Sequence, residues 1–451
     1  MPHDISFFLQ HNKINNKQTI HRIIIEAPRS KPLRMRLLWR FKAFLERNIR
    51  MKKHLYQLSG FFMLFVLVSF FHLLLFPIQS YGQTGVTETE IIVGQSCALK
   101  GPAQALGMGM RDGAKAYINY VNSMGGIKGK KIRLISYDDG YEPDICAANT
   151  KKLIDQDKVF LLFGYVGTPT SAAAVPIATE KQVPYFAPFT GAELLRTPVN
   201  RHVFNIRASY YQETEAMVEQ LISVKNIKRI SVFYQNDSYG KAGLDGVKRA
   251  LAKRDLEILN EANYPRNTLE VESAVKDMLK TNPDAIIMVG AYAPCAKFIS
   301  EMRKQGNKAL FLNVSFVGSD AMGQILQNNG LGVVVTQVVP FPFFKKIPVV
   351  GEYHRLLKQF TPEVEPNFMG MEGFIAAKAL CKILAETPEP VTRKGFIDTA
   401  EKQVHADLGG FTISFSPDNH QGSNLVYLTQ VAPGGFISPI VSLRDLYEYV
   451  K

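Results

Sequence analysis

The chain has 451 residues, of which 46% are hydrophobic, enough to bury large cores in two or three domains. Its formal net charge of +13 suggests a nucleic-acid partner until the charges are located. Residues 1–82 hold 13 Lys/Arg against 3 Asp/Glu, whereas the remainder holds 40 against 37. The basic charge therefore belongs to the N-terminal segment, and no nucleic-acid partner is predicted for the rest.

The N-terminal segment has the pattern of an export signal. The stretch 61–76 is apolar except for one serine and one histidine; basic residues precede it and small residues follow. This predicts a signal peptide over 51–82, cleaved before Gln83, and hence a periplasmic protein; the alternative is an uncleaved membrane anchor. Residues 1–50 form a basic extension, and because Met51 begins a well-formed signal, we hypothesise that translation starts there.

The segment after the signal alternates β-rich runs with amphipathic helical runs. A first series predicts strands at 90–94, 131–137, 159–163 and 183–189, with helices around 108–124, 144–156 and 170–182. After the run at 202–209, a second series predicts strands at 229–235, 256–264, 284–290 and 309–316. Continuous apolar strands separated by helices predict parallel sheets covered on both faces.

The C-terminal part departs from this rhythm, with a strand predicted at 332–342, a helix within 371–386 and a β-hairpin over 409–431. The predicted fold class is α/β, with two doubly wound parallel-sheet lobes joined by a hinge that the chain crosses more than once. We expect lobe 1 to comprise 88–208 plus 340–408, and lobe 2 to comprise 209–339 plus 409–451.

A run of hydroxyl residues follows the strand at 159–163. Thr168, Thr170 and Ser171 surround Pro169, a favoured first helical residue. Free N–H groups and the helix dipole make this end suited to a carboxylate, although capping by Thr168 alone is an equal alternative. Thr190 follows the next strand and is expected at the same edge of the sheet.

Two tyrosines are candidates for the opposite wall of the cleft. Tyr239 and Tyr292 each lie just beyond a strand of the second series. A tyrosine offers a flat apolar face and one hydrogen-bonding group, which suits a small ligand; the alternative for each is a core position.

No pattern of catalytic or metal-binding residues is present. "GMGMRDG" (107–113) lacks the third glycine of a dinucleotide-binding loop and falls inside a predicted helix, and no P-loop, G-x-S-x-G or H-E-x-x-H occurs. The cysteines have no zinc or redox spacing. Disulfides remain open for Cys97, Cys146, Cys295 and Cys381, and buried free thiols are an equal alternative for Cys295 and Cys381. We therefore expect no enzyme, no cofactor and no metal.

Three segments together resemble a known family: "GGIKGKKIRL", "GTPTSAAAVPIATEKQVPYFAPFTGAEL" and "NDSYGKAGLDG". They resemble the leucine/isoleucine/valine-binding type of periplasmic solute-binding protein that feeds ABC transporters, over about 90–427. The resemblance implies a monomer that binds an amino acid or small carboxylate between its lobes and delivers it to an inner-membrane permease. By position, 168–171 and Thr190 match segments that hold the ligand's α-carboxylate, and Tyr239 and Tyr292 match tyrosines of lobe 2.

The chain also departs from this family. The acid that meets the ligand's ammonium group falls near Ser315, where no acid stands, so Ser315 marks a changed site. Asp320 and Glu372 are candidates to replace that acid, each with a helix cap or surface charge as the blander alternative. Leu106 stands where the amino-acid binders have a tyrosine.

A further departure concerns the family's lobe 1 disulfide: Cys146 lies near one half, but the partner position reads Gly167. The rival functional hypothesis is a ligand-sensing receptor module of the same fold that signals through a membrane partner.

Overall fold

The computed structural model describes residues 35–36, 39–40, 42–44, 46–51, 53–54, 62–67 and 83–448. Most of the predicted signal peptide at 51–82 and of the basic extension at 1–50 lies outside these described residues. Within the described parts of the chain, no helix combines the length and apolarity needed to cross a membrane.

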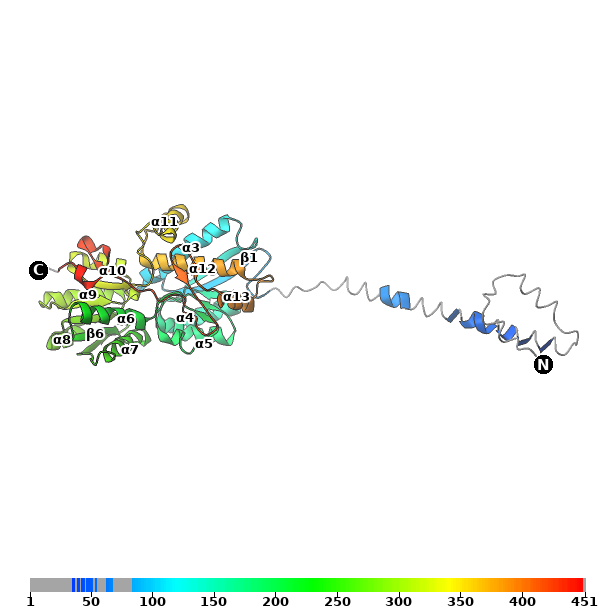
Figure 1. Ribbon diagram of the computed structural model, residues 1–451, viewed down its shortest axis with the longest axis horizontal. Helices are drawn as coiled ribbons and strands as arrows, with labels where there is room; N and C mark the ends of the chain where they lie inside the picture. Colours follow the sequence, from blue (N-terminus) through cyan, green and yellow to red (C-terminus); the bar gives the residue numbers. More distant parts are fainter. Residues whose placement is uncertain are drawn as a thin grey trace. The chain divides into compact units, whose positions relative to one another are not determined.

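The segment from residue 83 onward forms two lobes, each built on one β-sheet (Figure 1). Lobe 1 has a five-stranded parallel sheet in the order β2-β1-β3-β4-β5. The inner strand β1 is buried along almost its whole length, because helices cover both faces of the sheet. Its strands are β1 (Glu90–Cys97), β2 (Lys131–Asp138), β3 (Leu161–Phe163), β4 (Tyr185–Phe186) and β5 (Val203–Phe204).

Helices from two distant parts of the chain cover lobe 1. The first group comprises α3 (Gln104–Ser123), α4 (Pro143–Asp155) and α5 (Thr168–Glu180). The second group comprises α11 (Pro348–Phe360), α12 (Phe368–Glu386) and α13 (Arg393–Ala400). In Figure 1, α3 and α12 lie side by side, and both α11 and α12 contact α3.

Glycines allow the backbones of α3 and α12 to approach closely. A Cβ added to Gly113 would lie 1.9 Å from the carbonyl oxygen of Gly370, and one added to Gly373 would lie 2.1 Å from that of Met110. The "GMGMRDG" run is therefore a helix-packing surface, and its predicted position inside a helix is confirmed.

Lobe 2 has a seven-stranded sheet in the order β14-β13-β10-β9-β8-β6-β7. The five strands from β10 to β7 run parallel, while β13 and β14 add an antiparallel edge. Its strands are β6 (Ile230–Gln235), β7 (Glu261–Tyr264), β8 (Ala285–Val289), β9 (Leu310–Asn313), β10 (Val334–Gln337), β13 (Tyr427–Val431) and β14 (Ile437–Ile440). Its helices are α6 (Tyr210–Glu219), α7 (Ser238–Ala252), α8 (Glu272–Thr281), α9 (Tyr292–Lys304) and α10 (Ser319–Leu326).

Within residues 83–448 the chain passes between the lobes in three segments, 205–209, 338–347 and 414–426. The predicted α/β fold with two doubly wound lobes and a hinge crossed several times is therefore confirmed.

The hairpin predicted over 409–431 is wrong. Strand β12 (Thr412–Ile413) pairs with β11 (Ala406–Asp407), whereas β13 pairs with β10 and β14. Between them, Asn205 exchanges backbone hydrogen bonds with His420 and Gly422, so this stretch pairs with lobe 1 although it was predicted to belong to lobe 2. The alternating pattern showed extended chain but not its pairing partner, which is set by distant strands.

Candidate ligand-binding site

The hydroxyl run begins α5 at the end of β3, as predicted. The turn between them needs glycine, because Gly164 and Gly167 have φ values of 60° and 105°. A Cβ on Gly167 would also lie 2.2 Å from the ring of Tyr141. This position therefore has no room for the cysteine of the family's disulfide, and all four cysteines are free and buried.

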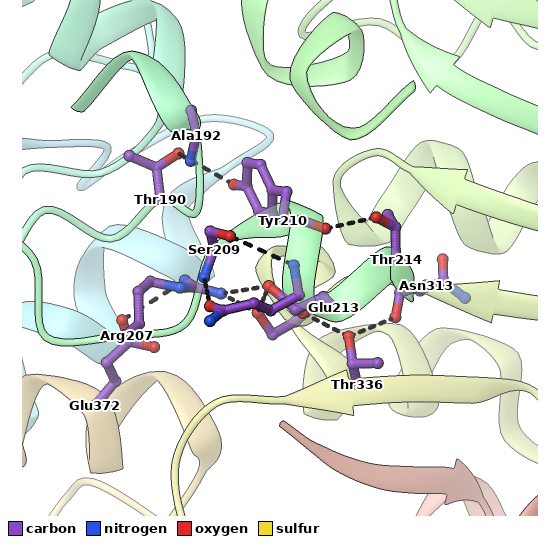
Figure 2. Close-up of polar contacts among 12 residues, drawn as sticks. Thr190, Ala192, Arg207, Ser209, Tyr210, Glu213, Thr214, Asn313, Thr336 and Glu372 are labelled. Carbon is purple, nitrogen blue, oxygen red and sulfur yellow. Dashed lines mark hydrogen bonds and ion pairs between the residues drawn. The ribbon is translucent and has the colours of Figure 1, made fainter. Parts of the chain in front are cut away.

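Two of the predicted hydroxyls meet at the edge of lobe 1. Thr168 Oγ1 lies 2.7 Å from Thr190 Oγ1, and Thr190 Oγ1 donates to the hydroxyl of Tyr210 at 3.2 Å. Tyr210 is the first residue of α6, directly after the first crossing segment (Figure 2). Burial raises the pKa of Tyr210 to about 12, so its hydroxyl keeps its proton at neutral pH.

The other two hydroxyls of the run form bonds inside lobe 1. Thr170 Oγ1 donates to the carbonyl oxygens of Val166 and, at 3.0 Å, Gly167. Ser171 Oγ accepts from the Tyr185 hydroxyl at 3.0 Å. The structure thus separates the predicted group into a Thr168–Thr190 pair and two residues with intralobe partners.

Tyr239 is completely buried at the start of α7. The helix begins here because Asp237 Oδ1 accepts from the N–H groups of Tyr239 and Gly240, at 2.9 and 3.3 Å. The Tyr239 ring packs 4.5 Å from that of Phe316 and 5.5 Å from that of Tyr210, measured between centroids. It therefore contacts the same tyrosine as the Thr168–Thr190 pair.

Tyr292 is partly buried at the start of α9. Burial raises its pKa, and a hydrogen bond with the backbone of Ala105 in lobe 1 opposes this shift. A Cβ on Gly318 would lie 3.4 Å from Tyr292 and 2.8 Å from Leu106, so both side chains adjoin this glycine. Leu106, which replaces a tyrosine of the amino-acid binders, is fully buried there.

Aromatic side chains of the two lobes meet beside this site. Phe316 of lobe 2 lies 5.5 Å from Phe189 and 6.0 Å from Tyr141 of lobe 1. Gln235 Nε2 donates to the Tyr141 hydroxyl at 3.3 Å. These contacts, which sequence reasoning missed, hold the lobes against one another.

A second interlobe contact lies nearer the solvent. Arg266 Nη2 of lobe 2 donates to Glu142 Oε2 at 2.6 Å, and Asn267 Nδ2 donates to Glu142 Oε1 at 2.7 Å. We call Glu142, Arg266 and Asn267 the rim clamp.

A buried charge cluster lies at the first crossing segment (Figure 2). Arg207 Nη2 is 3.3 Å from Glu213 Oε1, and Arg207 Nη1 is 3.6 Å from Glu372 Oε1. The side chains of Arg207 and Glu213 are fully buried, and that of Glu372 is 6% exposed. We call these three residues the Arg207 cluster.

The Arg207 cluster places the carboxylate of Glu213 next to Ser315. Glu213 Oε2 accepts from the Ser315 N–H at 2.7 Å, and Glu213 Oε1 accepts from the Ser315 hydroxyl at 3.0 Å. Arg207 also donates to the Ser315 hydroxyl, and Thr336 donates to Glu213. The sequence offers one sign of this cluster: Arg207 is a charged residue directly after the mostly apolar run "VFNI".

The two acids proposed to replace the missing one have different positions. Asp320 Oδ2 accepts from the Phe368 N–H at 3.1 Å, at the start of α12, so its interpretation as a helix cap is confirmed. The same interpretation is wrong for Glu372, which is buried and faces Arg207. Burial raises the pKa of Glu372 to about 7; Arg207 opposes the shift and Glu213 adds to it.

The site has no arrangement for a metal: the described residues contain no group of three or more His, Cys, Asp or Glu that could hold one.

A cavity of about 550 Å³ lies where the second and third crossing segments meet, with Val339, Phe341 and Phe368 among its apolar walls. The predicted site residues do not line this cavity.

Comparisons with known proteins identify the family and the fold. A family described as periplasmic binding protein matches residues 90–435. Leu/Ile/Val-binding protein homolog 7 of Brucella abortus is 22% identical over 330 residues, or 70% of this chain and 80% of that protein. An amino acid binding protein of Pseudomonas aeruginosa is 21% identical over 233 residues, or 52% of this chain and 62% of the relative's length.

A solved structure gives the same result. A possible leucine/isoleucine/valine-binding protein of Rhodopirellula baltica is 36% identical and superposes with a TM-score of 0.76, over 80% of this chain and 98% of that one. The family resemblance and the fold class expected from the sequence are both confirmed.

Proposed function

This chain belongs to the periplasmic binding protein family, and from that premise we propose that it captures a branched-chain amino acid or a related small carboxylate between its lobes. It then delivers this solute to an inner-membrane ABC permease. Proteins of this family bind solutes rather than catalyse reactions.

The observation that carries the proposal is the meeting of Thr168, Thr190 and Tyr210 at the edge of lobe 1. Hydroxyls at a helix start can donate to a carboxylate, and the helix dipole favours a negative charge there. Tyr239 and Tyr292 of lobe 2 supply the opposite wall. Thr170, Ser171 and Ser315 support this site through their bonds to the surrounding chain.

Closure is the mechanism that we propose. A ligand that contacts both lobes stabilises the arrangement in which the lobes meet, and the permease distinguishes this arrangement from the open one. The rim clamp and the aromatic contacts of Phe316 provide the lobe-to-lobe contacts of the closed form.

Calorimetric titration of the full-length protein with L-leucine, L-valine and their acids without the amine tests the site. Thr168→Val and Thr190→Val should each weaken binding by about tenfold or more, because each removes a hydrogen bond to a charged group. Thr399→Val is the matched control: its hydroxyl donates to Gly395 within α13. Unchanged affinity in both cleft variants would contradict the assignment.

Delivery to a transporter has its own test. Cells that lack this protein should lose uptake of the ligand found by calorimetry and regain it when the protein is restored. Normal uptake without the protein would contradict the transport role while leaving the binding site intact.

Export with cleavage before Gln83 belongs to the same proposal. Gln83 and the residues after it pack into lobe 1: Gln83 Oε1 accepts from the Arg393 N–H at 3.4 Å, and Gln83 O accepts from Val86. N-terminal sequencing of the periplasmic protein should begin at Gln83. A start within 51–82 would indicate an uncleaved segment.

A further inference from the structure

The two carboxylates of the Arg207 cluster differ in their hydrogen bonds. Glu213 accepts from Arg207, from the N–H and hydroxyl of Ser315, and from Thr336. Among residues 83–448, Glu372 has no hydrogen-bond donor, and its one ion pair is with Arg207 Nη1 at 3.6 Å. Figure 2 shows the two acids on either side of the Arg207 guanidinium.

A buried carboxylate without donors is costly, because it has given up water and gained nothing in exchange. The Nε and Nη1 atoms of Arg207, next to Glu372, are likewise buried without a hydrogen-bond partner. A carboxylate that accepts no hydrogen bond thus lies beside guanidinium nitrogens that donate none. This is the condition of a site whose missing partner comes from outside the chain.

The Arg207 cluster adjoins the hydroxyl pair. The Arg207 guanidinium lies 4.9 Å from the ring centroid of Phe189, the residue before Thr190. Arg196 Nη2 donates to the carbonyl oxygens of both Thr190 and Arg207, at 3.4 and 3.1 Å. Phe189 and Arg196 therefore connect the Arg207 cluster, which includes Glu372, to the Thr168–Thr190 pair.

We infer that Glu372 accepts the ammonium group of an α-amino acid whose carboxylate lies at the Thr168–Thr190 pair. This rests on the proposed function and narrows it to a ligand that carries an amine. The ammonium donors come from the ligand, while Arg207 positions Glu372. The amine is then held by lobe 1, whereas the family resemblance implies an acid of lobe 2.

Asp320 is the competing candidate, and its bonding argues against it. Its carboxylate already accepts the Phe368 N–H at 3.1 Å, which fixes it at the start of α12. Glu213 is excluded for the same reason, since its oxygens are engaged by Ser315, Thr336 and Arg207.

The test uses matched probes that differ only in the amine: L-leucine with 4-methylpentanoate, L-valine with 3-methylbutanoate, and L-phenylalanine with 3-phenylpropanoate. Affinities are measured by calorimetry on the full-length wild type, Glu372→Gln and the control Asp320→Asn. The wild type should bind the amino acid of its preferred pair about 100-fold more tightly than the acid without the amine. Glu372→Gln should remove this preference, and Asp320→Asn should keep it.

The outcomes separate the inference from the proposed function. If the wild type binds an acid without the amine as tightly as the amino acid, the inference is wrong but the carboxylate site stands. Retention of the preference in Glu372→Gln would also overturn it. If that variant fails to fold, equal binding of the paired probes by the wild type is the result that overturns the inference. Failure of every probe to bind would overturn the inference and the proposed function together.

Discussion

Arg207 lies between two carboxylates with different roles: Glu213 stabilises the structure, whereas Glu372 has no hydrogen-bond donor among residues 83–448 and is free to bind a ligand. On the lobe 2 side, Glu213 is fully buried and bonded to side chains and backbone of lobe 2. On the lobe 1 side, Glu372 is nearly as buried, but among the described residues it accepts no hydrogen bond and forms one ion pair, with Arg207 at 3.6 Å. Burial does not distinguish the two roles; the number of satisfied hydrogen bonds does.

The largest effect is expected when Glu213, the acid with the structural role, is removed. Glu213→Ala leaves Arg207, Ser315 and Thr336 with unpaired buried groups, and should lower the free energy of unfolding by about 3–5 kcal/mol. Urea denaturation measures this, with Glu215→Ala on the same helix as the control. Glu215 is partly exposed and paired with Arg254, so its removal should cost at most about 1 kcal/mol. Equal losses for both variants would contradict the structural role of Glu213.

Removing the charge of Glu372 should have the opposite effect and raise the free energy of unfolding. Burial raises the pKa of Glu372 from its ordinary 4.5 to about 7, so the folded protein keeps this proton to a higher pH than the unfolded chain. The stability that this provides is present below pH 4.5 and is lost as pH rises through 7. Glu372→Gln should match the wild type at pH 4.5 and exceed its free energy of unfolding by up to about 3 kcal/mol at pH 7.5.

Urea denaturation at both pH values gives the difference between the two proteins. Burial raises the pKa of Asp320 to about 6. Because Asp320 titrates in both proteins, its contribution cancels from the difference between their free energies of unfolding. A Glu372→Gln variant less stable than the wild type at pH 7.5 would mean that Glu372 is structural like Glu213.

Ligand binding should sharpen the contrast further. An ammonium group binds the ionised form of Glu372, which Arg207, Glu213 and Arg196 surround. Below about pH 7 this carboxyl must first lose its proton, so amino-acid affinity should fall by about tenfold per pH unit. Calorimetry at pH 5.5, 6.5 and 7.5 is designed to measure this slope. A slope retained in Glu372→Gln would assign the proton to another group.

The smallest effect is expected at the rim clamp. Glu142→Gln weakens an interlobe contact that is partly exposed, so affinity should fall by about threefold or less, corresponding to under 1 kcal/mol. The free energy of unfolding should be unchanged. If Glu142→Gln loses more affinity than Thr190→Val, the main closing contact lies at the rim and not in the buried cleft.

Local patterns were sufficient for the architecture. Apolar strands such as that beginning at Glu90, and the helices between them, are decided by neighbouring residues, and those predicted between 90 and 316 lie near their observed positions. The hydroxyl run was expected at the end of a strand and lies there. The hairpin at 409–431 failed because extended chain does not reveal which strand it pairs with.

The sequence by itself determined the α/β lobes, the position of the hydroxyl run and the lack of an acid at Ser315, because each depends on residues close together in the chain. Only the tertiary structure decided that Thr168 pairs with Thr190 while Thr170 and Ser171 turn inward. It also decided that Glu213, Arg207 and Glu372 meet. Whether a buried charge is satisfied depends on partners brought together from distant parts of the chain, and no local pattern carries that information.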